Sequence, residues 1–356
     1  MIKQISISEF HLRLTKPFTY ATLTMHELPY AMVQITDESG NIGYGEAAAS
    51  WDVNGETPAG AVALNDIISR LLTGQKLATV DDVRNCLDAI SREVAFNFAL
   101  KSGIEAALLD LLGKVTGKNV LELLGGKPKE IYSQRIISMA DYAAALQGEL
   151  DPKLKGAIFV KVKSNSNVDA LIPVLEYIRQ KFPNLKITLD ANQGWGDYES
   201  AMAKLHLVEP YKIEWIEQPC LADDLASLKK LTKESPISIM LDESICDYRD
   251  VVLNMEAGVG NMINIKLAKC GGILEAVKIA AWCDEHKVKY MIGDMIHSQL
   301  GAVTNIYAGA LSSPMIHDQN DPERVADDPT SGVSYNKETN SFLPPTGPGL
   351  GIEVKK

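Results

Sequence analysis

The spacing of hydrophobic and polar positions changes twice along the chain. Up to about residue 50 apolar and polar residues alternate, and together with a turn at 37–40 this predicts a β-meander. From about 57 to 124 apolar residues recur three and four positions apart, which predicts amphipathic helices. Two glycines and a proline at 125–128 then interrupt the pattern. We therefore predict a first, α+β domain over residues 1–125.

Beyond this break, short apolar runs alternate with helical segments. The polar residues near the ends of consecutive runs lie 24 to 27 positions apart. A unit of that length holds one strand, one helix and two loops, and a succession of such units closes into a (β/α) barrel. The predicted strands are 158–163, 186–191, 213–219, 238–243, 262–269, 288–295 and 314–321, with an earlier one at 131–138.

The pattern thus predicts an α/β protein with a (β/α)-barrel domain over residues 126–335. The segment 336–356 is predicted to be extended and to return to the first domain. An open doubly wound sheet is the alternative, but no Gly-rich phosphate loop follows any predicted strand, which favours the barrel.

Charge and cysteine content narrow the class of partner. The net charge of -11 argues against nucleic acid or an anionic membrane surface. Five scattered cysteines without a CxxC pair favour reduced thiols in a cytoplasmic protein. No stretch has the length of a membrane span, and the N-terminus lacks the apolar run of a signal peptide. We expect a cytoplasmic protein with a small-molecule substrate.

Acidic residues stand near the ends of three consecutive predicted strands: Asp190, Glu217 and Asp242. The carboxyl ends of parallel barrel strands meet at one face, so these side chains are expected to converge. Three carboxylates together repel one another unless a cation neutralises them, and oxygen ligands without His or Cys suit Mg2+. Each acid alone could cap the following helix instead. Their matched position on all three strands favours the magnesium site.

Lysines flank the acidic residues on neighbouring strands. Lys161 and Lys163 lie two positions apart and therefore share a face, and Lys266 and Lys269 follow one strand beyond the acids. A lysine that is partly desolvated or near another cation has a lowered pKa and can act as a base. We expect Lys163 and Lys266 to face a substrate from opposite sides of the barrel. Such a pair suits removal of a proton next to a carboxylate and its return from either side, with a metal stabilising the enediolate. A solvated surface charge is the alternative for any one of them.

These motifs in combination resemble the enolase superfamily, in its muconate-lactonising-enzyme branch. The matching stretches are VKVK, LDANQGW, IEQP, LDES and NIKLAKCGGI, while GYGEA and KSGIEAALLDLLGK match the capping domain of that family. The resemblance covers nearly the whole chain and implies a modified TIM barrel with an α+β capping domain. It implies one Mg2+ per subunit on the three carboxylates and Lys163 with Lys266 as the acid/base pair, as such sites use a Lys or His base with Mg2+. It also implies that Lys161 holds the substrate carboxylate and that Asn192 lines the site.

Within that branch the chain most resembles the dipeptide epimerases, by PFTYATLTMHELPYAMV and MIHDQNDP. In that group an Asp-x-Asp motif at the eighth strand binds the ammonium of the dipeptide. Here Asp318 matches the first position but Asn320 holds the second, so Asp321, after a slip of one residue, or Asp294 is expected to supply the missing charge. His297 stands where relatives usually carry Glu, and both a catalytic and a loop-packing role are open for it.

The resemblance also bears on specificity. Members that act on Ala-Glu carry an Arg at the position that here is Leu23. An apolar residue cannot pair with a side-chain carboxylate. We therefore expect Mg-dependent epimerisation of L-Ala-L-Xaa or D-Ala-L-Xaa with a neutral, preferably hydrophobic, second residue.

Other functions compete with this one. An N-acylamino acid racemase, an o-succinylbenzoate synthase or a muconate cycloisomerase-like enzyme belongs to the same branch, and the first two need no anion such as Asp318 at the eighth strand. A Schiff-base aldolase would leave the three carboxylates without a role, and a non-catalytic descendant would not need both lysines. Barrel enzymes of this kind often assemble, so a homo-oligomer is compatible with the sequence, which specifies no symmetry.

Overall fold

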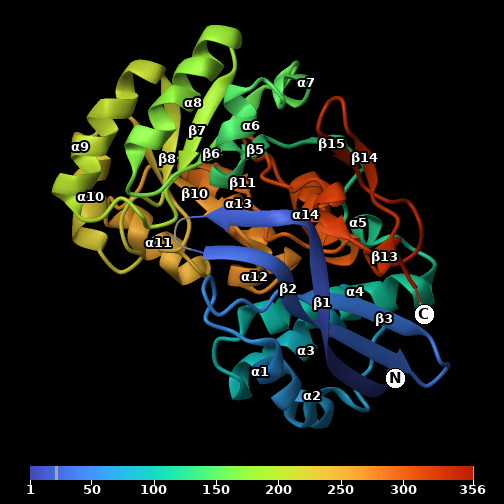
Figure 1. The fold of residues 1–356 in the computed structure, drawn as a ribbon. Coiled ribbons are helices and arrows are strands. Elements are labelled where there is room, and N and C mark those ends of the chain that lie inside the picture. The colour runs from blue at the N-terminus through green and yellow to red at the C-terminus, as the bar shows by residue number, and fades with distance from the viewer. Residues whose placement is uncertain (21–22, 356) are drawn as a thin grey trace.

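The computed structural model describes residues 1–20 and 23–355 and shows an N-terminal sheet-and-helix unit below a barrel of parallel strands (Figure 1). The N-terminal sheet is antiparallel, with the strand order β12-β1-β2-β3. Its strands are β1 (Ile2–Tyr20), β2 (Leu23–Asp37), β3 (Ile42–Ala47) and β12 (Val325–Ala326). The predicted meander is present, and its first hairpin is longer than the sequence pattern indicated because β1 stays paired with β2 as far as Tyr20.

Helices cover one face of this sheet. They are α1 (Pro58–Ala63), α2 (Asn65–Leu72), α3 (Val80–Glu93), α4 (Phe98–Thr116) and the short α5 (Val120–Leu123). Helix α4 is almost completely buried, and it approaches β3 so closely that a Cβ on Gly45 would overlap the carbonyl of Gly103. The small residues in GYGEA thus let the helix and the sheet share one core.

The parallel sheet has the order β11-β10-β9-β8-β7-β6-β5, and it closes through residue His317. His317 bridges both Ser133 and Ile292, so the ends of the sheet meet through one short segment instead of a regular eighth strand. The strands are β4 (Ile131–Tyr132), which lies outside the barrel, β5 (Arg135–Ile137), β6 (Phe159–Lys163), β7 (Lys186–Asp190), β8 (Ile213–Glu217), β9 (Ser238–Leu241), β10 (Met262–Ile265) and β11 (Lys289–Ile292). The barrel with an antiparallel N-terminal domain confirms the predicted fold class.

Three predicted strands are wrong in extent. The run 131–138 is not one strand, because it splits into β4, which pairs with β15 outside the barrel, and β5, which belongs to the barrel. The run 262–269 is a strand only to Ile265, because the chain turns at Lys266 into helix α12 (Leu267–Cys270), which ends at Gly271 in the left-handed region. The run 314–321 forms only the bridges at His317, since the chain leaves the barrel at once to make a turn.

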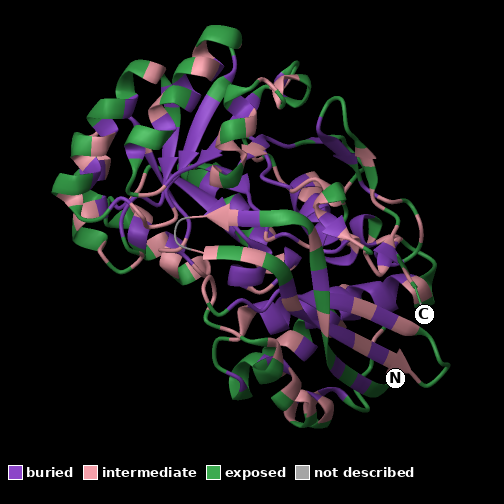
Figure 2. Ribbon diagram, viewed as in Figure 1, coloured by how far each residue is buried: buried purple, intermediate pink, exposed green. Residues whose placement is uncertain are grey.

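Helices follow the strands and surround the barrel, with their polar faces exposed and the strands buried (Figure 2). They are η1 (Met139–Asp141), α6 (Tyr142–Leu146), α7 (Asp151–Leu154), α8 (Val168–Lys181), α9 (Tyr198–Val208), η2 (Glu209–Tyr211), α10 (Leu225–Glu234), α11 (Tyr248–Glu256), α13 (Ile273–His286), α14 (Gln299–Leu311) and η3 (Pro322–Arg324). Within the described part of the chain, no helix is both long and apolar enough to cross a membrane.

The C-terminal segment contacts both parts of the molecule. Its strands are β13 (Thr330–Ser331), β14 (Ser334–Asn336), β15 (Ser341–Leu343) and β16 (Glu353–Val354). Strand β15 pairs with β4 beside the barrel, whereas the backbone N–H of Leu350 donates to Asp110 on α4. The predicted domain limits, including the assignment of 336–356 to the first domain, stay a prediction.

Candidate active site

The carboxyl ends of the barrel strands bring the predicted acids and lysines together. In the strand register Lys163 lies opposite Asp190, and Asp190 lies opposite Glu217. Asp190, Glu217 and Asp242 are fully buried, and the lysines are nearly so. Strands β6 and β10, which end at Lys163 and just before Lys266, are four positions apart in the closed sheet and so lie across the barrel from each other.

Two lysines neutralise the first two acids. The Oδ2 atom of Asp190 lies 2.6 Å from Lys163 Nζ and 3.2 Å from Lys161 Nζ. Lys161 Nζ also lies 2.8 Å from Glu217 Oε2, and Asn264 donates to Glu217 Oε1 at 2.8 Å. The buried ammonium of Lys161 therefore lies between the carboxylates of Asp190 and Glu217.

The third acid has its own partners. Asp242 accepts hydrogen bonds from Lys266 Nζ at 2.6 Å and from Lys269 Nζ at 2.5 Å. Its backbone N–H donates to the side chain of Gln218 at 2.9 Å, which fixes the turn after β9. No sequence motif predicted a role for Asn264 or Gln218, and their hydrogen bonds in the structure show that they support Glu217 and Asp242.

The acids and lysines of this cluster shift one another's pKa values. Burial and the neighbouring Asp190 raise the pKa of Glu217 to about 8, although Lys161 opposes the shift. Burial also acts to raise the pKa of Asp242, but Lys266 and Lys269 outweigh it and hold that pKa well below its ordinary value. Of the three acids, Glu217 is thus the one whose ionised form the site disfavours, and added positive charge would lower its pKa.

The donor set fits a hard divalent cation. In the described residues no three His, Cys, Asp or Glu side chains converge as a finished metal site, because the carboxylate oxygens turn toward the lysines. The Oε2 atom of buried Glu217 has no hydrogen-bond partner despite its closeness to Lys161. Three all-oxygen donors of this kind, with one orphaned oxygen, suit Mg2+ better than a softer metal.

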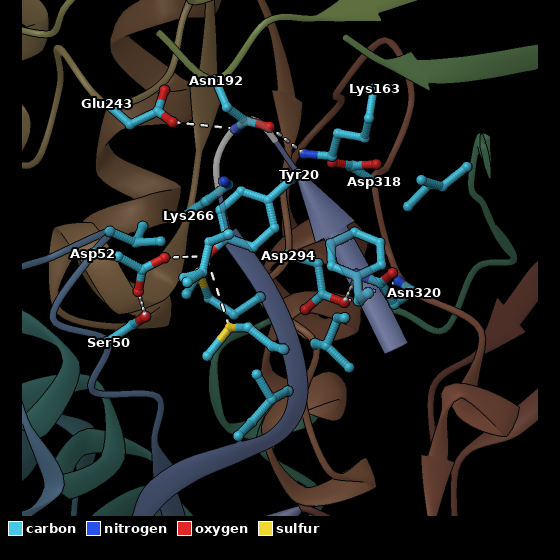
Figure 3. Close-up of a pocket in the computed structure, with 18 of the residues that line it drawn as sticks. Tyr20, Ser50, Asp52, Lys163, Asn192, Glu243, Lys266, Asp294, Asp318 and Asn320 are labelled. Atoms are coloured by element: carbon cyan, nitrogen blue, oxygen red, sulfur yellow. Dashed lines mark hydrogen bonds between the residues drawn. The ribbon is translucent and has the colours of Figure 1, made fainter. Parts of the chain in front are cut away.

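A cavity of about 230 Å³ lies directly over this cluster, between the barrel mouth and the N-terminal unit (Figure 3). Of the residues predicted from the sequence, it is lined by Lys163, Lys266, Asn192, Leu23, Asp294, Asp318 and Asn320. Lys161, the three acids and His297 do not line it, and Asp321 lines a different cavity.

The N-terminal hairpin supplies an apolar wall of which only Leu23 was predicted from the sequence. Its lining residues are Phe18, Tyr20, Leu23, Met25, Leu28 and Tyr30. Apolar residues from other elements complete the lining of the cavity: Trp51, Val53, Ile136, Met295 and Ile296. The hydroxyl of Tyr20 donates to Asp52, and its ring lies 5.8 Å from Lys163 Nζ. This link joins the hairpin to the loop after β3 above the predicted base.

The eighth-strand segment departs from the expected arrangement. Both oxygens of Asp318 are engaged, Oδ2 by Lys161 at 2.5 Å and Oδ1 by Gln134 at 2.9 Å. Asp321 instead accepts the backbone N–H of Glu323 at 2.9 Å as a helix cap, so the slip of one residue does not bring its carboxylate to this cavity.

Asp294 and His297 belong to one buried network. Asp294 Oδ2 accepts the backbone N–H of Asn320 at 2.9 Å and its Nδ2–H at 3.1 Å. His297 Nε2 lies 3.3 Å from Asp294 Oδ1, and His297 Nδ1 lies 2.5 Å from Glu46 Oε1. Burial raises the pKa of Asp294 to about 6, whereas the acids around His297 outweigh its burial and raise its pKa.

Comparison with known families agrees with this architecture. Residues 3–125 match the family described as "Mandelate racemase / muconate lactonizing enzyme, N-terminal domain". Residues 144–356 match the family described as "Enolase C-terminal domain-like". Together the two matches cover nearly the whole chain.

Several curated relatives are epimerases or racemases. The chain is 31% identical to the hydrophobic dipeptide epimerase of Enterococcus faecalis over 85% of both chains, and 31% identical to the L-Ala-D/L-Glu epimerase of Bacillus subtilis over 99% of this chain and 96% of that one. The N-succinyl-L-Arg/Lys racemase of Bacillus cereus is 26% identical, over 100% and 96% of the two chains. The o-succinylbenzoate synthase of Bacillus subtilis is 27% identical, over 100% and 95%.

Two solved structures with ligands share the fold. The dipeptide epimerase of Enterococcus faecalis in complex with Mg and L-Leu-L-Tyr superposes with a TM-score of 0.88 at 28% identity, covering 99% of each chain. The dipeptide epimerase of Cytophaga hutchinsonii in complex with Mg and D-Ala-L-Val superposes with a TM-score of 0.90 at 26% identity, covering 100% of this chain and 96% of that one. The chain therefore belongs to the mandelate racemase/muconate lactonizing enzyme family, in the muconate-lactonising branch of the enolase superfamily.

Proposed function

We propose that this protein is a Mg2+-dependent epimerase that inverts the second residue of a dipeptide. The observation that carries the proposal is the pair of lysines, Lys163 and Lys266, that lines one cavity from opposite strands above three buried acids. Two opposed bases can remove the α-proton from one face and deliver a proton to the other, which is what inversion at carbon requires.

Each residue then has a defined task. Asp190, Glu217 and Asp242 would hold Mg2+, which supplies positive charge beside the carboxylate of the substrate as its α-carbon loses a proton. Lys163 Nζ and Lys266 Nζ exchange the α-proton, and Lys161, deeper in the barrel, contributes a further fixed positive charge.

The acids also control the protonation of the bases. Burial lowers the pKa of Lys266, but Asp242, Glu217 and Glu243 outweigh it, so the net shift is upward. A divalent cation on these carboxylates would offset their negative charge and lower the pKa of Lys266. Metal binding and base activation are therefore coupled in this proposal.

The cavity favours an apolar substrate side chain. Leu23, Met25 and Leu28 lie on the hairpin wall, and among the residues that the structure describes this wall carries no Arg or Lys that could pair with a side-chain carboxylate. The Enterococcus faecalis relative, a hydrophobic dipeptide epimerase whose structure contains L-Leu-L-Tyr, supports the same preference. We therefore propose a neutral or hydrophobic second residue.

A second candidate function has an observation of its own. Asp318 is already neutralised by Lys161 and Asn320 is uncharged, so the eighth-strand segment offers no free carboxylate for an ammonium. N-Acylamino acids, which lack that ammonium, are the alternative substrates, and racemases and synthases of this kind are also among the relatives.

The test is a substrate panel assayed for inversion with the purified protein and Mg2+. The panel contains L-Ala-L-Phe, L-Ala-L-Leu, L-Ala-L-Glu, N-acetyl-L-Phe and N-succinyl-L-Phe, with chiral chromatography of hydrolysed products as the readout. We expect kcat/KM to be highest for the apolar dipeptides. A higher value for either N-acylated amino acid would move the assignment to the racemase alternative.

A further inference from the structure

We propose that a second cavity, between the N-terminal unit and the barrel, binds a small oxyanion, a phosphate or a carboxylate, on the ammonium of Lys101. The cavity has a volume of about 520 Å³, and among the described residues it shares none of its lining with the cavity above Lys163 and Lys266. The inference goes beyond the proposed function, because it concerns a separate site and does not depend on which substrate the barrel takes.

Helices from both parts of the molecule line this cavity. Helices α3 and α4 of the N-terminal unit form one side, and α12 and α13 of the barrel form the other. Helices α4 and α12 are in direct contact, with α12 beside α4 below the barrel (Figure 1). A molecule held here would therefore touch both parts of the chain.

Lys101 is a buried cation without a counter-ion. It is only 8% exposed, and within the described part of the chain its Nζ atom has neither a hydrogen bond nor an ion pair. The nearest favourable group is the ring of Phe98, whose centre lies 5.4 Å from Nζ. Burial lowers the pKa of Lys101, and only the more distant Glu56 opposes the shift. A desolvated, unpaired ammonium costs free energy, which a bound anion recovers.

The buried acids nearest to Lys101 are engaged elsewhere. Glu56 accepts the backbone N–H groups of Ala99 and Leu100 at the start of α4, at 2.8 Å and 3.2 Å. Glu105 accepts the backbone N–H of Ile273 at the start of α13 at 2.5 Å. Burial raises the pKa of Glu105 to about 8, so this carboxyl carries little charge at neutral pH. Neither acid therefore takes the place of an anion beside Lys101.

The other charged residues of the lining do not neutralise Lys101 either. Arg84 and Lys278 are exposed and form ion pairs within their own helices, at 2.7 Å and 3.2 Å. Exposed ion pairs are weak, so both cations remain available to an anion. Asp247 caps α11, and Asp88 is exposed to water that screens its charge. Lys101 is thus the lining charge that is both buried and unpaired.

The site lies against the turn that follows the predicted base Lys266. Helix α12 begins directly after Lys266 and ends at Gly271. A Cβ at Gly271 would lie 3.6 Å from the Phe98 ring and 3.9 Å from Lys101 Cβ, so α4 packs directly on this turn. Because an anion would bind the folded chain and contact both units, it should raise the Tm.

Titration calorimetry of the Mg2+-loaded full chain with inorganic phosphate and with acetate, at constant ionic strength, tests the site. We expect saturable binding of at least one anion, and the tighter ligand identifies the class. Lys101→Met should weaken this binding about tenfold or more, the scale of one hydrogen bond to a charged group. Lys76→Met, at an exposed lysine outside this cavity, is the matched control and should change nothing. Absence of saturable binding, or equal affinity in Lys101→Met and wild type, would overturn the inference.

Thermal unfolding separates a ligand site from a purely structural lysine. Without phosphate or acetate, Lys101→Met should raise the Tm, because an apolar side chain of similar length replaces an unpaired buried ammonium. The variant should also lose the increase in Tm that the anion causes in the wild type. A lower Tm without the anion, together with an undiminished increase on adding it, would assign Lys101 a structural role and overturn the inference.

Lysine labelling gives a readout that needs no substitution. An amine-reactive acetyl ester is applied to the wild type, and the acetylated lysines are mapped by mass spectrometry. The anion that binds in the titration should slow acetylation at Lys101 and leave that at Lys76 unchanged. Equal labelling of Lys101 with and without the anion would contradict binding at this site.

Discussion

Single residues at the strand ends determine the electrostatics of the site. Lys161 contacts Asp190, Glu217 and Asp318, so one ammonium is shared by three acids. A buried ion cluster of this kind is costly unless every charge has a partner. Oε2 of Glu217 has only the ion pair with Lys161 at 2.8 Å and no hydrogen bond besides. The acid whose pKa is raised to about 8 is therefore also the one most responsive to an added cation.

This charge balance predicts how stability responds to pH and metal. A carboxyl with a folded-state pKa of about 8 binds a proton more tightly in the folded chain than in the unfolded chain. Its contribution to the free energy of unfolding is therefore complete at low pH and is lost as the pH rises through 8. Mg2+ replaces that proton, so we expect the increase in Tm on adding Mg2+ to be larger at about pH 8.5 than at about pH 6.

Calorimetry of the same protein at both pH values checks this expectation. Glu217→Gln should remove most of the pH dependence of the Mg2+-induced change in Tm, because the amide does not ionise. A Tm increase that is equal at both pH values in the wild type would contradict the assignment of Glu217 as a metal-binding acid.

The elements around the site differ in how far the sequence alone reveals them. Strands β6 to β10 were predictable because each is a short apolar run with a charged residue at its end or directly after it, a purely local signal. The outer parts of β1 and β2, up to Tyr20 and from Leu23 onward, were not, since prolines at 17 and 29 interrupt the alternation and only pairing between the two strands extends them. Tertiary contacts there override the local pattern.

The hairpin is the element that we expect to control selectivity. Leu23→Arg places a cation on the cavity wall, and we predict that it raises kcat/KM for L-Ala-L-Glu relative to L-Ala-L-Phe by about tenfold or more, the scale of one Arg–carboxylate hydrogen bond. Thr24→Arg, on the exposed face of the same strand, adds the same charge outside the cavity and is the control. An equal change of the ratio in both variants would show that net charge, and not the cavity wall, is responsible.

At the scale of the whole molecule, the site exists only because the two parts of the chain are held together. Glu105 on α4 accepts the backbone N–H of Ile273 at the start of α13 at 2.5 Å, and the hydroxyl of Tyr30 donates to the carbonyl of Ile296 at 3.0 Å. These contacts place the hairpin over the barrel mouth. The spacing of the barrel residues predicted the floor of the site, but its walls join residues more than a hundred positions apart, which no local pattern encodes.

In the proposed mechanism, two lysines exchange the α-proton of a dipeptide from opposite faces. Proton NMR in D2O with Mg2+ and L-Ala-L-Phe tests it most directly, by following deuterium at the α-carbon of the second residue. We expect rapid exchange in the wild type and a decrease of about a hundredfold or more in the variant that lacks the lysine on the face of the α-proton, either Lys163→Ala or Lys266→Ala. The variant that lacks the opposite lysine should keep exchange but lose inversion, because the remaining base still removes the α-proton and returns deuterium to the same face. Exchange at the wild-type rate in both variants, inversion in either variant, or no exchange with any dipeptide in the wild type would contradict the two-lysine mechanism.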